Sequence, residues 1–168
     1  FVAEDIGSRY EGLETSYSSE GYPRLGDPDA PVVVEEFASF SCPGCASFHD
    51  TSFRQLLPRV ELGQVLFTYI PLQTGSVQNA EGSARLLAGV GALGLDSGAF
   101  NSCFNSDAIT STLNAAQNEG VTSTPTIRVN GVDAGLTIDE IQTAIDAGIP
   151  PGWSPNRNTS ETPADSTV

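Results

Sequence analysis

The 168-residue chain contains no lysine and no methionine, and its basic side chains are seven arginines and one histidine. With 21 acidic residues, the formal net charge is -14. Charged residues make up 17%, against about 25% in typical domains, and the shortfall is close to an ordinary lysine content. Two explanations stay open. Adaptation to salt would call for many more acidic residues, so we favour modified lysine and methionine residues that the written sequence omits. The absence of a basic stripe argues against nucleic acid as a partner.

Long hydrophobic runs are absent as well. No apolar stretch reaches the length of a membrane span, and the first residues, FVAEDIGS, lack the pattern of a signal peptide. Because the chain does not begin with methionine, we expect that a signal peptide or an N-terminal anchor has been removed upstream. The length and the hydrophobic content of 39% fit one soluble domain with a substantial core.

The composition divides the chain into three expected parts. Residues 1–24 are polar and rich in glycine and serine, which predicts an extended or partly helical N-terminal arm. Residues 25–152 carry the strand and helix patterns of one domain. Residues 153–168 have no hydrophobic period, which predicts a flexible tail or tether.

The first half of the central domain alternates strand and helix patterns. Residues 32–37 and 65–72 are short, apolar stretches that predict strands. Between them, CASFHDTSFRQLLPRV has nearly helical apolar spacing, and Pro58 is expected to bend or end that helix. Further helical patterns cover residues 79–93 and 107–120.

A hairpin and a helix complete the domain. PTIRVNGV, residues 125–132, has the pattern of a strand, an Asn-Gly turn and a second strand. A capping box of Thr137 and Glu140 and a terminal glycine predict a helix over residues 137–148. The order strand, helix, strand, helical stretch, hairpin, helix predicts an α/β protein with a thioredoxin fold. The helical insertion would occupy about residues 74–119, between the second strand and the hairpin.

Two of the three cysteines, Cys42 and Cys45, lie where the first strand of this fold passes into its helix. A helix N-terminus offers unpaired N–H groups and the positive end of the helix dipole, so a thiolate there is stabilised and its pKa falls. Cys42 would be the exposed nucleophile, and Cys45, one turn inside, the covered resolving thiol. Pro43 suits the first helical turn, where its missing N–H costs little.

Other interpretations of these cysteines were weighed. An inert disulfide is less favoured, because a bridge at a helix start is strained and accessible, as redox-active bridges are. A zinc site would need four ligands, Cys42, Cys45, His49 and Cys103. However, there is no second CxxC pair, and His49 is more typical of a partly exposed surface residue. Cys103 stands next to phenylalanine and is typical of a buried free thiol, pairing between molecules being the minor case. No metal or other cofactor is expected.

The stretches LGDPDAPVVVEEFASFSCPGC, FTYIPL and GVTSTPTIRVNG together resemble the DsbA-like thiol-disulfide oxidoreductases. The resemblance covers about residues 24–72 and 120–148. It rests on the CPxC pair, the Gly-Asp-Pro lead-in to the strand and the distal Thr-Pro, which occur in the same order.

The resemblance implies roles for four of these residues. Cys42 would be the attacking cysteine and Cys45 the resolving one. Thr124 and Pro125 would form a loop that faces the pair, with a cis peptide before Pro125. The backbone of Thr124 would then be free to pair with a substrate peptide as an added strand.

The sequence also departs from the family pattern. Strong oxidants of the family often have histidine between the cysteines, whereas Pro43 and Gly44 stand there in this chain. These two residues are expected to contact the substrate together with Thr124 and Pro125. Without an imidazole one contribution to thiolate stabilisation is lost, so the resemblance does not fix the reduction potential. The stretch from Thr74 to Glu119 is also shorter than the usual insertion.

The expected function is disulfide exchange with client proteins that contain cysteines, with the oxidant direction favoured. A reductase or an isomerase that uses the same pair is one alternative. A non-catalytic thioredoxin-fold module that binds a partner or a metal is an alternative of another class. A membrane or soluble redox partner would renew the pair. Since disulfide donation requires an oxidising compartment, we expect an extracytoplasmic protein that is periplasmic, secreted or anchored.

Overall fold

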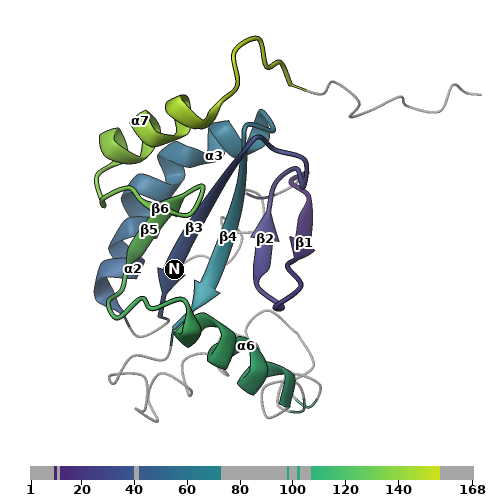
Figure 1. Ribbon diagram of the computed structural model, residues 1–168, viewed down its shortest axis with the longest axis vertical. Helices are drawn as coiled ribbons and strands as arrows, with labels where there is room; N and C mark the ends of the chain where they lie inside the picture. Colours follow the sequence, from purple (N-terminus) through teal and green to yellow (C-terminus); the bar gives the residue numbers. More distant parts are fainter. Residues whose placement is uncertain are drawn as a thin grey trace, which may run out of the picture.

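The computed structural model describes residues 10, 12–39, 42–72, 98, 102 and 107–155. Its strands are β1 (Thr15–Tyr17), β2 (Pro23–Leu25), β3 (Val32–Ala38), β4 (Val65–Pro71), β5 (Thr126–Val129) and β6 (Val132–Asp133). They form one mixed sheet in the order β1-β2-β4-β3-β5-β6 (Figure 1). The helices are α2 (Pro43–Phe48), the π-helix η1 (His49–Phe53), α3 (Arg54–Glu61), α6 (Asp107–Asn118) and α7 (Ile138–Gly148).

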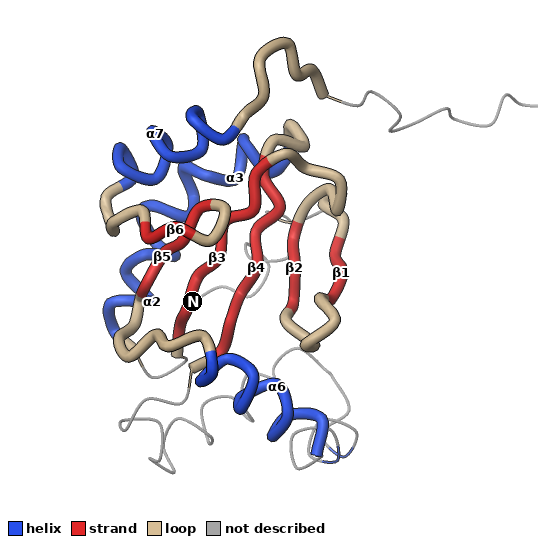
Figure 2. Tube along the Cα trace, viewed as in Figure 1, coloured by secondary structure: helices blue, strands red, loops and turns tan. Residues whose placement is uncertain are grey.

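The sheet is covered by helices that pack into two hydrophobic clusters. Strands β3 and β4 are parallel, and the continuous helical segment α2–η1–α3 connects them. Together with α7 this segment encloses the larger cluster (Figure 2). The second cluster includes Ala116 of α6 and lies against the opposite face of the sheet. The segment α2–η1–α3 therefore begins at the end of β3, a strand that is fixed by the burial of its side chains.

Alternation along β3 decides which side chains face the α2–η1–α3 segment. Val32 and Val34 are fully buried in the larger cluster, whereas Phe37 belongs to the second one. Because successive strand residues point to opposite faces, Glu36 takes the next position after Val34 on the helix-covered face. This carboxylate is 0% exposed, so an acidic group stands where the pattern predicts an aliphatic one.

Most of the predicted elements are confirmed. Strands β3 and β4, helix α6 and the hairpin of β5 and β6 lie where the sequence predicts them. The hairpin turn has positive φ at both Asn130 (49°) and Gly131 (78°), as a two-residue Asn-Gly turn requires. Both hydrogen bonds of the Thr137–Glu140 capping box are present at the start of α7. The chain has a thioredoxin fold with a helical insertion between β4 and β5. The helix predicted over residues 79–93 lies outside the described residues.

Of the two effects expected of Pro58, a bend or an end of its helix, the end is wrong. It lies inside α3, which continues to Glu61. Proline removes one helical hydrogen bond and crowds the carbonyl of residue 54. The buried side chains Leu56, Leu57 and Val60 hold the helix against the sheet on both sides of that position. Tertiary packing therefore outweighs the local preference.

The segment expected to be an N-terminal arm contains a β-hairpin. Strands β1 and β2 pair with each other, and β2 then pairs with β4, where Arg24 lies opposite Thr68. The chain leaves β2 through Gly26, whose φ is +110°. A Cβ at this position would lie 2.7 Å from the carbonyl oxygen of Val65, so only glycine allows the close approach to β4.

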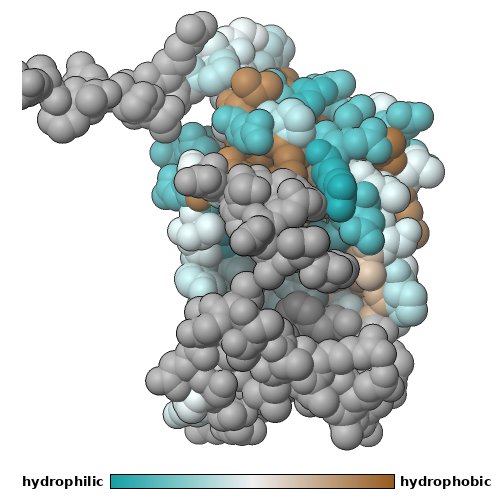
Figure 3. Space-filling model, turned by 180° about the vertical axis from the view of Figure 1, so that it is seen from behind, coloured by the Kyte–Doolittle hydropathy of each residue, from teal (hydrophilic) through white to brown (hydrophobic). Residues whose placement is uncertain are grey.

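The described surface is of the ordinary mixed kind. Viewed from behind, hydrophobic residues form small groups among hydrophilic ones on the part of this face that the structure describes (Figure 3). Among the described residues, no helix is both long and apolar enough to cross a membrane.

Candidate functional site

The cysteine pair lies at the start of α2, directly after β3. Cys42 is the N-cap of the helix, with an extended backbone, and Pro43 opens the first turn. The backbone N–H of Cys45 donates a hydrogen bond to Cys42 Sγ at 3.3 Å. Both cysteines are free thiols in this structure, Cys42 half-buried and Cys45 buried at 4% exposure.

The loop before β5 lies against this pair. The Thr124–Pro125 peptide is cis, as the family resemblance implies. Cys42 Sγ donates to the carbonyl oxygen of Thr124 at 3.3 Å, although the two residues are 82 positions apart. A Cβ on Gly44 would lie only 3.0 Å from Pro125 Cδ. The fold thus brings together all six predicted site residues, namely Cys42, Pro43, Gly44, Cys45, Thr124 and Pro125.

The surroundings of Cys42 favour its thiolate. Partial burial acts to raise the pKa of this thiol, but hydrogen bonds from its neighbours outweigh that effect, so the pKa is lowered from its ordinary value. The donors are the side chains of Cys45 and Thr124 and the backbone N–H groups of Cys45 and Gly44. The lowered pKa therefore comes from the helix start and the facing loop, without an imidazole between the cysteines.

The surroundings of Cys45 have the opposite effect. Burial, the hydrogen bond with Cys42, and the negative charges of Cys42 and Glu36 together raise the pKa of the Cys45 thiol to about 12. Only the backbone of Ser39 acts in the other direction. One sulfur of the pair is thus prepared to be a thiolate, and the other is held as a thiol.

Glu36 of β3 and His49 of η1 form a second polar pair, which the sequence interpretation missed. His49 Nε2 lies 2.6 Å from Glu36 Oε2, an ion-pair distance. Neither carboxylate oxygen of Glu36 has a hydrogen-bond partner among the described residues. The signal for Glu36 was its place in the alternation after Val32 and Val34. His49 gave no comparable signal, because a partly exposed helix residue is common.

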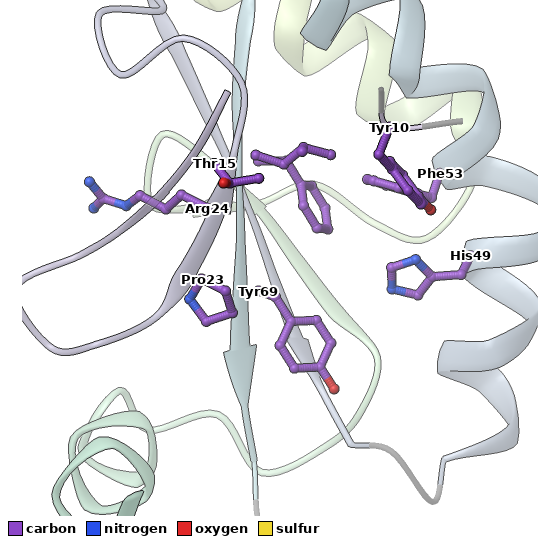
Figure 4. Close-up of a pocket in the computed structure, with 9 residues that line it drawn as sticks. Tyr10, Thr15, Pro23, Arg24, His49, Phe53 and Tyr69 are labelled. Atoms are coloured by element: carbon purple, nitrogen blue, oxygen red, sulfur yellow. The ribbon is translucent and has the colours of Figure 1, made fainter. Parts of the chain in front are cut away.

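An open pocket lies beside this pair, between the helical segment and the β1–β2 hairpin. Its volume is about 380 Å³, and its walls are mainly apolar and aromatic. His49 points into it from the helix, and Tyr69 enters it from β4 (Figure 4). Burial, followed by the charges of Glu36, Cys45 and Cys42, raises the pKa of the Tyr69 hydroxyl. The charges of Glu36 and of the two cysteines thus act on one side chain that lines this pocket.

Metal ligation by this region was the weaker sequence hypothesis. No group of three or more His, Cys, Asp or Glu side chains that could hold a metal ion occurs within the described ranges. Cys103, the fourth ligand of the zinc hypothesis, lies outside those ranges.

Comparison with known proteins agrees with the fold. The sequence model of the family described as Thioredoxin matches residues 18–89. A putative protein-disulfide oxidoreductase of Rickettsia felis is 27% identical over 164 residues, which cover 74% of this chain and 59% of that protein. This chain thus spans about three fifths of the length of that relative.

Solved structures show the same fold. The structure of alpha-DsbA1 from Wolbachia pipientis matches with a TM-score of 0.63 and 21% identity, over 78% of this chain and 92% of the other. Oxidised BdbD from Bacillus subtilis matches with a TM-score of 0.57 and 20% identity, over 81% and 97% of the two chains. The thioredoxin fold with its helical insertion is thus shared with DsbA structures.

Proposed function

We propose that this thioredoxin-like protein, which shares its fold with DsbA structures, is a thiol-disulfide oxidoreductase that oxidises client proteins through Cys42 and Cys45. The observation that carries the proposal is that the two thiols differ in accessibility and that their pKa values are shifted in opposite directions. Cys42 is accessible with a lowered pKa, whereas Cys45 is buried with a pKa raised to about 12. An exchange that begins and ends at Cys42 needs this asymmetry.

In the oxidised protein the two sulfurs share a disulfide. A client thiolate attacks Cys42 Sγ, the Cys42–Cys45 bond breaks, and Cys45 leaves and takes up a proton. A second client thiolate then attacks the client sulfur of the mixed disulfide, and Cys42 leaves as a thiolate. Counted from its two thiols, the client loses two electrons and two protons. The pair gains both electrons, Cys45 takes up one proton, and the other proton passes to water because Cys42 remains a thiolate.

The proposal that the protein donates its disulfide, rather than reducing its client, rests on Cys42, which is the leaving group of the second exchange. A thiol of low pKa leaves faster, and a stabilised thiolate stabilises the reduced protein. Both effects favour release of an oxidised client from Cys42. A reductase or isomerase would use the same sulfurs, but the lowered pKa of Cys42 favours donation of the disulfide.

The loop of Thr124 and Pro125 supplies the contact surface for the client. The Thr124 carbonyl lies 3.3 Å from Cys42 Sγ, so a client segment next to its reacting cysteine would run along this backbone. Pairing of an extended peptide with an exposed backbone segment requires no particular side-chain sequence. Such a surface suits a protein with many clients.

Donation of disulfides also bears on the compartment in which the protein works. Disulfides form and persist in oxidising compartments, so the protein acts outside the cytoplasm, where a membrane or soluble redox partner reoxidises the pair. No cofactor is required for the exchange itself.

The experiment mixes the oxidised protein with a reduced, unfolded client that has two cysteines. Wild type should oxidise the client, whereas Cys42→Ala should not. Reduced Cys45→Ala, mixed instead with the disulfide form of the client, should attack that disulfide through Cys42 and accumulate a covalent complex, which Cys42→Ala should not form. Equilibration with glutathione should give a reduction potential above that of glutathione. Client oxidation by Cys42→Ala at the wild-type rate would disprove the proposal.

A further inference from the structure

The pocket between the helical segment and the β1–β2 hairpin is built mainly from rings. Five of the residues that line it carry one, namely Tyr10, His49, Phe53, Phe67 and Tyr69. The ring centroid of Phe53 lies 4.5 Å from that of Phe67, 4.8 Å from that of His49 and 6.4 Å from that of Tyr10. The rings of His49 and Tyr69 are 6.5 Å apart. These distances are those at which aromatic side chains attract one another, so the walls form one ring cluster with an open side.

The interior of the pocket offers little to a charged ligand. The guanidinium of Arg24 points away from it (Figure 4). His49 Nε2 lies 2.6 Å from Glu36 Oε2, and Glu36 is 0% exposed, so this carboxylate is not presented to the pocket. The volume of about 380 Å³ is within the range of ligand pockets, whose walls are commonly apolar and aromatic. An uncharged aromatic group is therefore the occupant that these walls favour.

The pocket lies at the reactive end of the sheet. His49 follows Cys45 by four positions on the continuous helical segment. Tyr69 stands near the end of β4, and because β3 and β4 are parallel, this end lies beside the end of β3, from which the chain passes to Cys42. The charges of Cys45 and Cys42 contribute to the raised pKa of the Tyr69 hydroxyl, which also places the pocket near the pair. A client chain that crosses Cys42 is therefore within reach of the pocket.

Resting on the disulfide exchange proposed above, we propose that this pocket holds an aromatic side chain of the client whose cysteine reacts with Cys42. Pairing along the loop of Thr124 and Pro125 involves only the client backbone and does not distinguish one sequence from another. The pocket adds a preference among clients. Unfolded clients present the side chains that it needs, because folding is what buries most large apolar residues.

The geometry sets the spacing between the client cysteine and the aromatic residue. Seven positions separate Cys42 from His49 along the helical segment, which is about 10 Å at 1.5 Å per residue. An extended client advances about 3.3 Å per residue, so about three residues cover this distance. Alternate side chains of an extended chain point to opposite faces, and both the cysteine and the aromatic residue must face this protein. We therefore expect a spacing of two or four residues rather than three.

The test uses the full chain in its oxidised form, with Cys103→Ser, and reduced peptides that have two cysteines. The two peptides of each pair differ in one residue, phenylalanine or alanine, placed two, three or four positions from a cysteine on either side. Each oxidation rate is divided by the rate of the same peptide with oxidised glutathione, which removes differences in thiol reactivity. Thr15→Trp fills the pocket from an exposed position of β1. Tyr17→Trp is the matched control, because Tyr17 is exposed on the same face of β1 but does not line the pocket.

We expect wild type to oxidise the phenylalanine peptide about tenfold faster than its alanine partner at a spacing of two or four, since an apolar pocket gives discrimination of this size for a small change in an apolar group. At a spacing of three, where the ring points away, the ratio should be below about twofold. In Thr15→Trp the ratio should fall below about twofold at every spacing, because the new ring occupies the space that the client side chain needs. Tyr17→Trp should keep the wild-type ratio.

Equal rates for both peptides of every pair in wild type would overturn the proposal, as would a preference that survives in Thr15→Trp. Oxidation of the alanine peptides shows that a variant is folded and reactive. If Thr15→Trp fails this check, Tyr10→Ala takes its place, because it removes one wall of the pocket and should also lower the ratio. Failure of the function proposed above looks different, because wild type would then oxidise neither peptide.

Discussion

Cys42 Sγ and the carbonyl oxygen of Thr124 are 3.3 Å apart, although 82 positions separate these residues in the sequence. The contact joins the start of α2 to the loop before β5, and it exists because β3 and β5 are antiparallel neighbours in the sheet. In the proposed exchange, a client bound along this loop would therefore lie next to Cys42 Sγ because of the order of the strands in the sheet.

Alkylation should distinguish the two sulfurs of the pair. In the reduced protein near neutral pH, Cys42 should react with iodoacetamide at least about a hundredfold faster than Cys45, since only Cys42 is both accessible and stabilised as a thiolate. Because the pKa of Cys42 is lowered, its reaction should persist at a pH where an ordinary thiol is protonated. Mass spectrometry of quenched samples measures both rates, and equal rates would contradict the assignment.

Cys45→Ser provides the control for this measurement. It should keep Cys42 as the fast site but shift its profile to higher pH, because the side chain of Cys45 is one of the groups that lower the pKa of Cys42.

Gly44→Ala should disturb the contact between the helix and the loop. The new Cβ would lie 3.0 Å from Pro125 Cδ, so the loop must move away by a few tenths of an ångström. We expect oxidation of a protein client to slow by about two- to tenfold, the range that a crowded contact of about 1 kcal/mol produces. Exchange with glutathione, which does not need the loop, should change less. Ala46→Ser on the exposed side of α2 is the control, and equal slowing with both substrates would argue against a role of the loop.

Glu36→Leu should make the protein more stable. The substitution removes a buried carboxylate that has no hydrogen bond among the described residues, and the remaining partner, His49, is partly exposed and can be hydrated. Removing that desolvation cost should raise the free energy of unfolding, by up to about 1–4 kcal/mol. Denaturant unfolding of the reduced protein measures this, with Glu35→Leu on the opposite face as the control. A large loss of stability would mean that the ion pair with His49 contributes net stabilisation.

Thr137→Ala should remove the capping box of α7 and change the dependence of stability on pH. Hydrogen bonds from the Thr137 side chain and backbone lower the pKa of Glu140 from 4.5. A lowered pKa in the folded state contributes stability that is present above about pH 4.5 and is lost as the pH falls through the folded value. The variant should therefore have a lower Tm at neutral pH, and the difference from wild type should shrink in acid. A constant difference across this range would contradict the explanation.

Local patterns were sufficient to predict the central elements and the cysteine pair. Val32 and Val34 mark a buried strand, and the CPxC pair after it indicates a helix start. The contact of Glu36 with His49 was not predictable in this way, because it depends on how the helix docks over β3. Pro58 was interpreted from its local preference alone, whereas the packing of its neighbours decides the outcome.

The N-terminal hairpin was missed for another reason. Strands β1 and β2 have three residues each and include Pro23, so they carry almost no periodic signal. They form only because β4 offers a partner, as the pairing of Arg24 with Thr68 shows. A strand of this kind is a property of the assembled sheet rather than of its own residues.

The same hairpin has a consequence for the proposed exchange with unfolded clients. Unpaired edge strands attract other extended chains and lead to aggregation. By covering β4, the hairpin leaves the described sheet with two short edges, β1 of three residues and β6 of two. Neither offers a long template on which an unfolded client could stack. In the proposed function, a client strand would therefore pair mainly along the loop beside Cys42, next to the sulfur with which it would react.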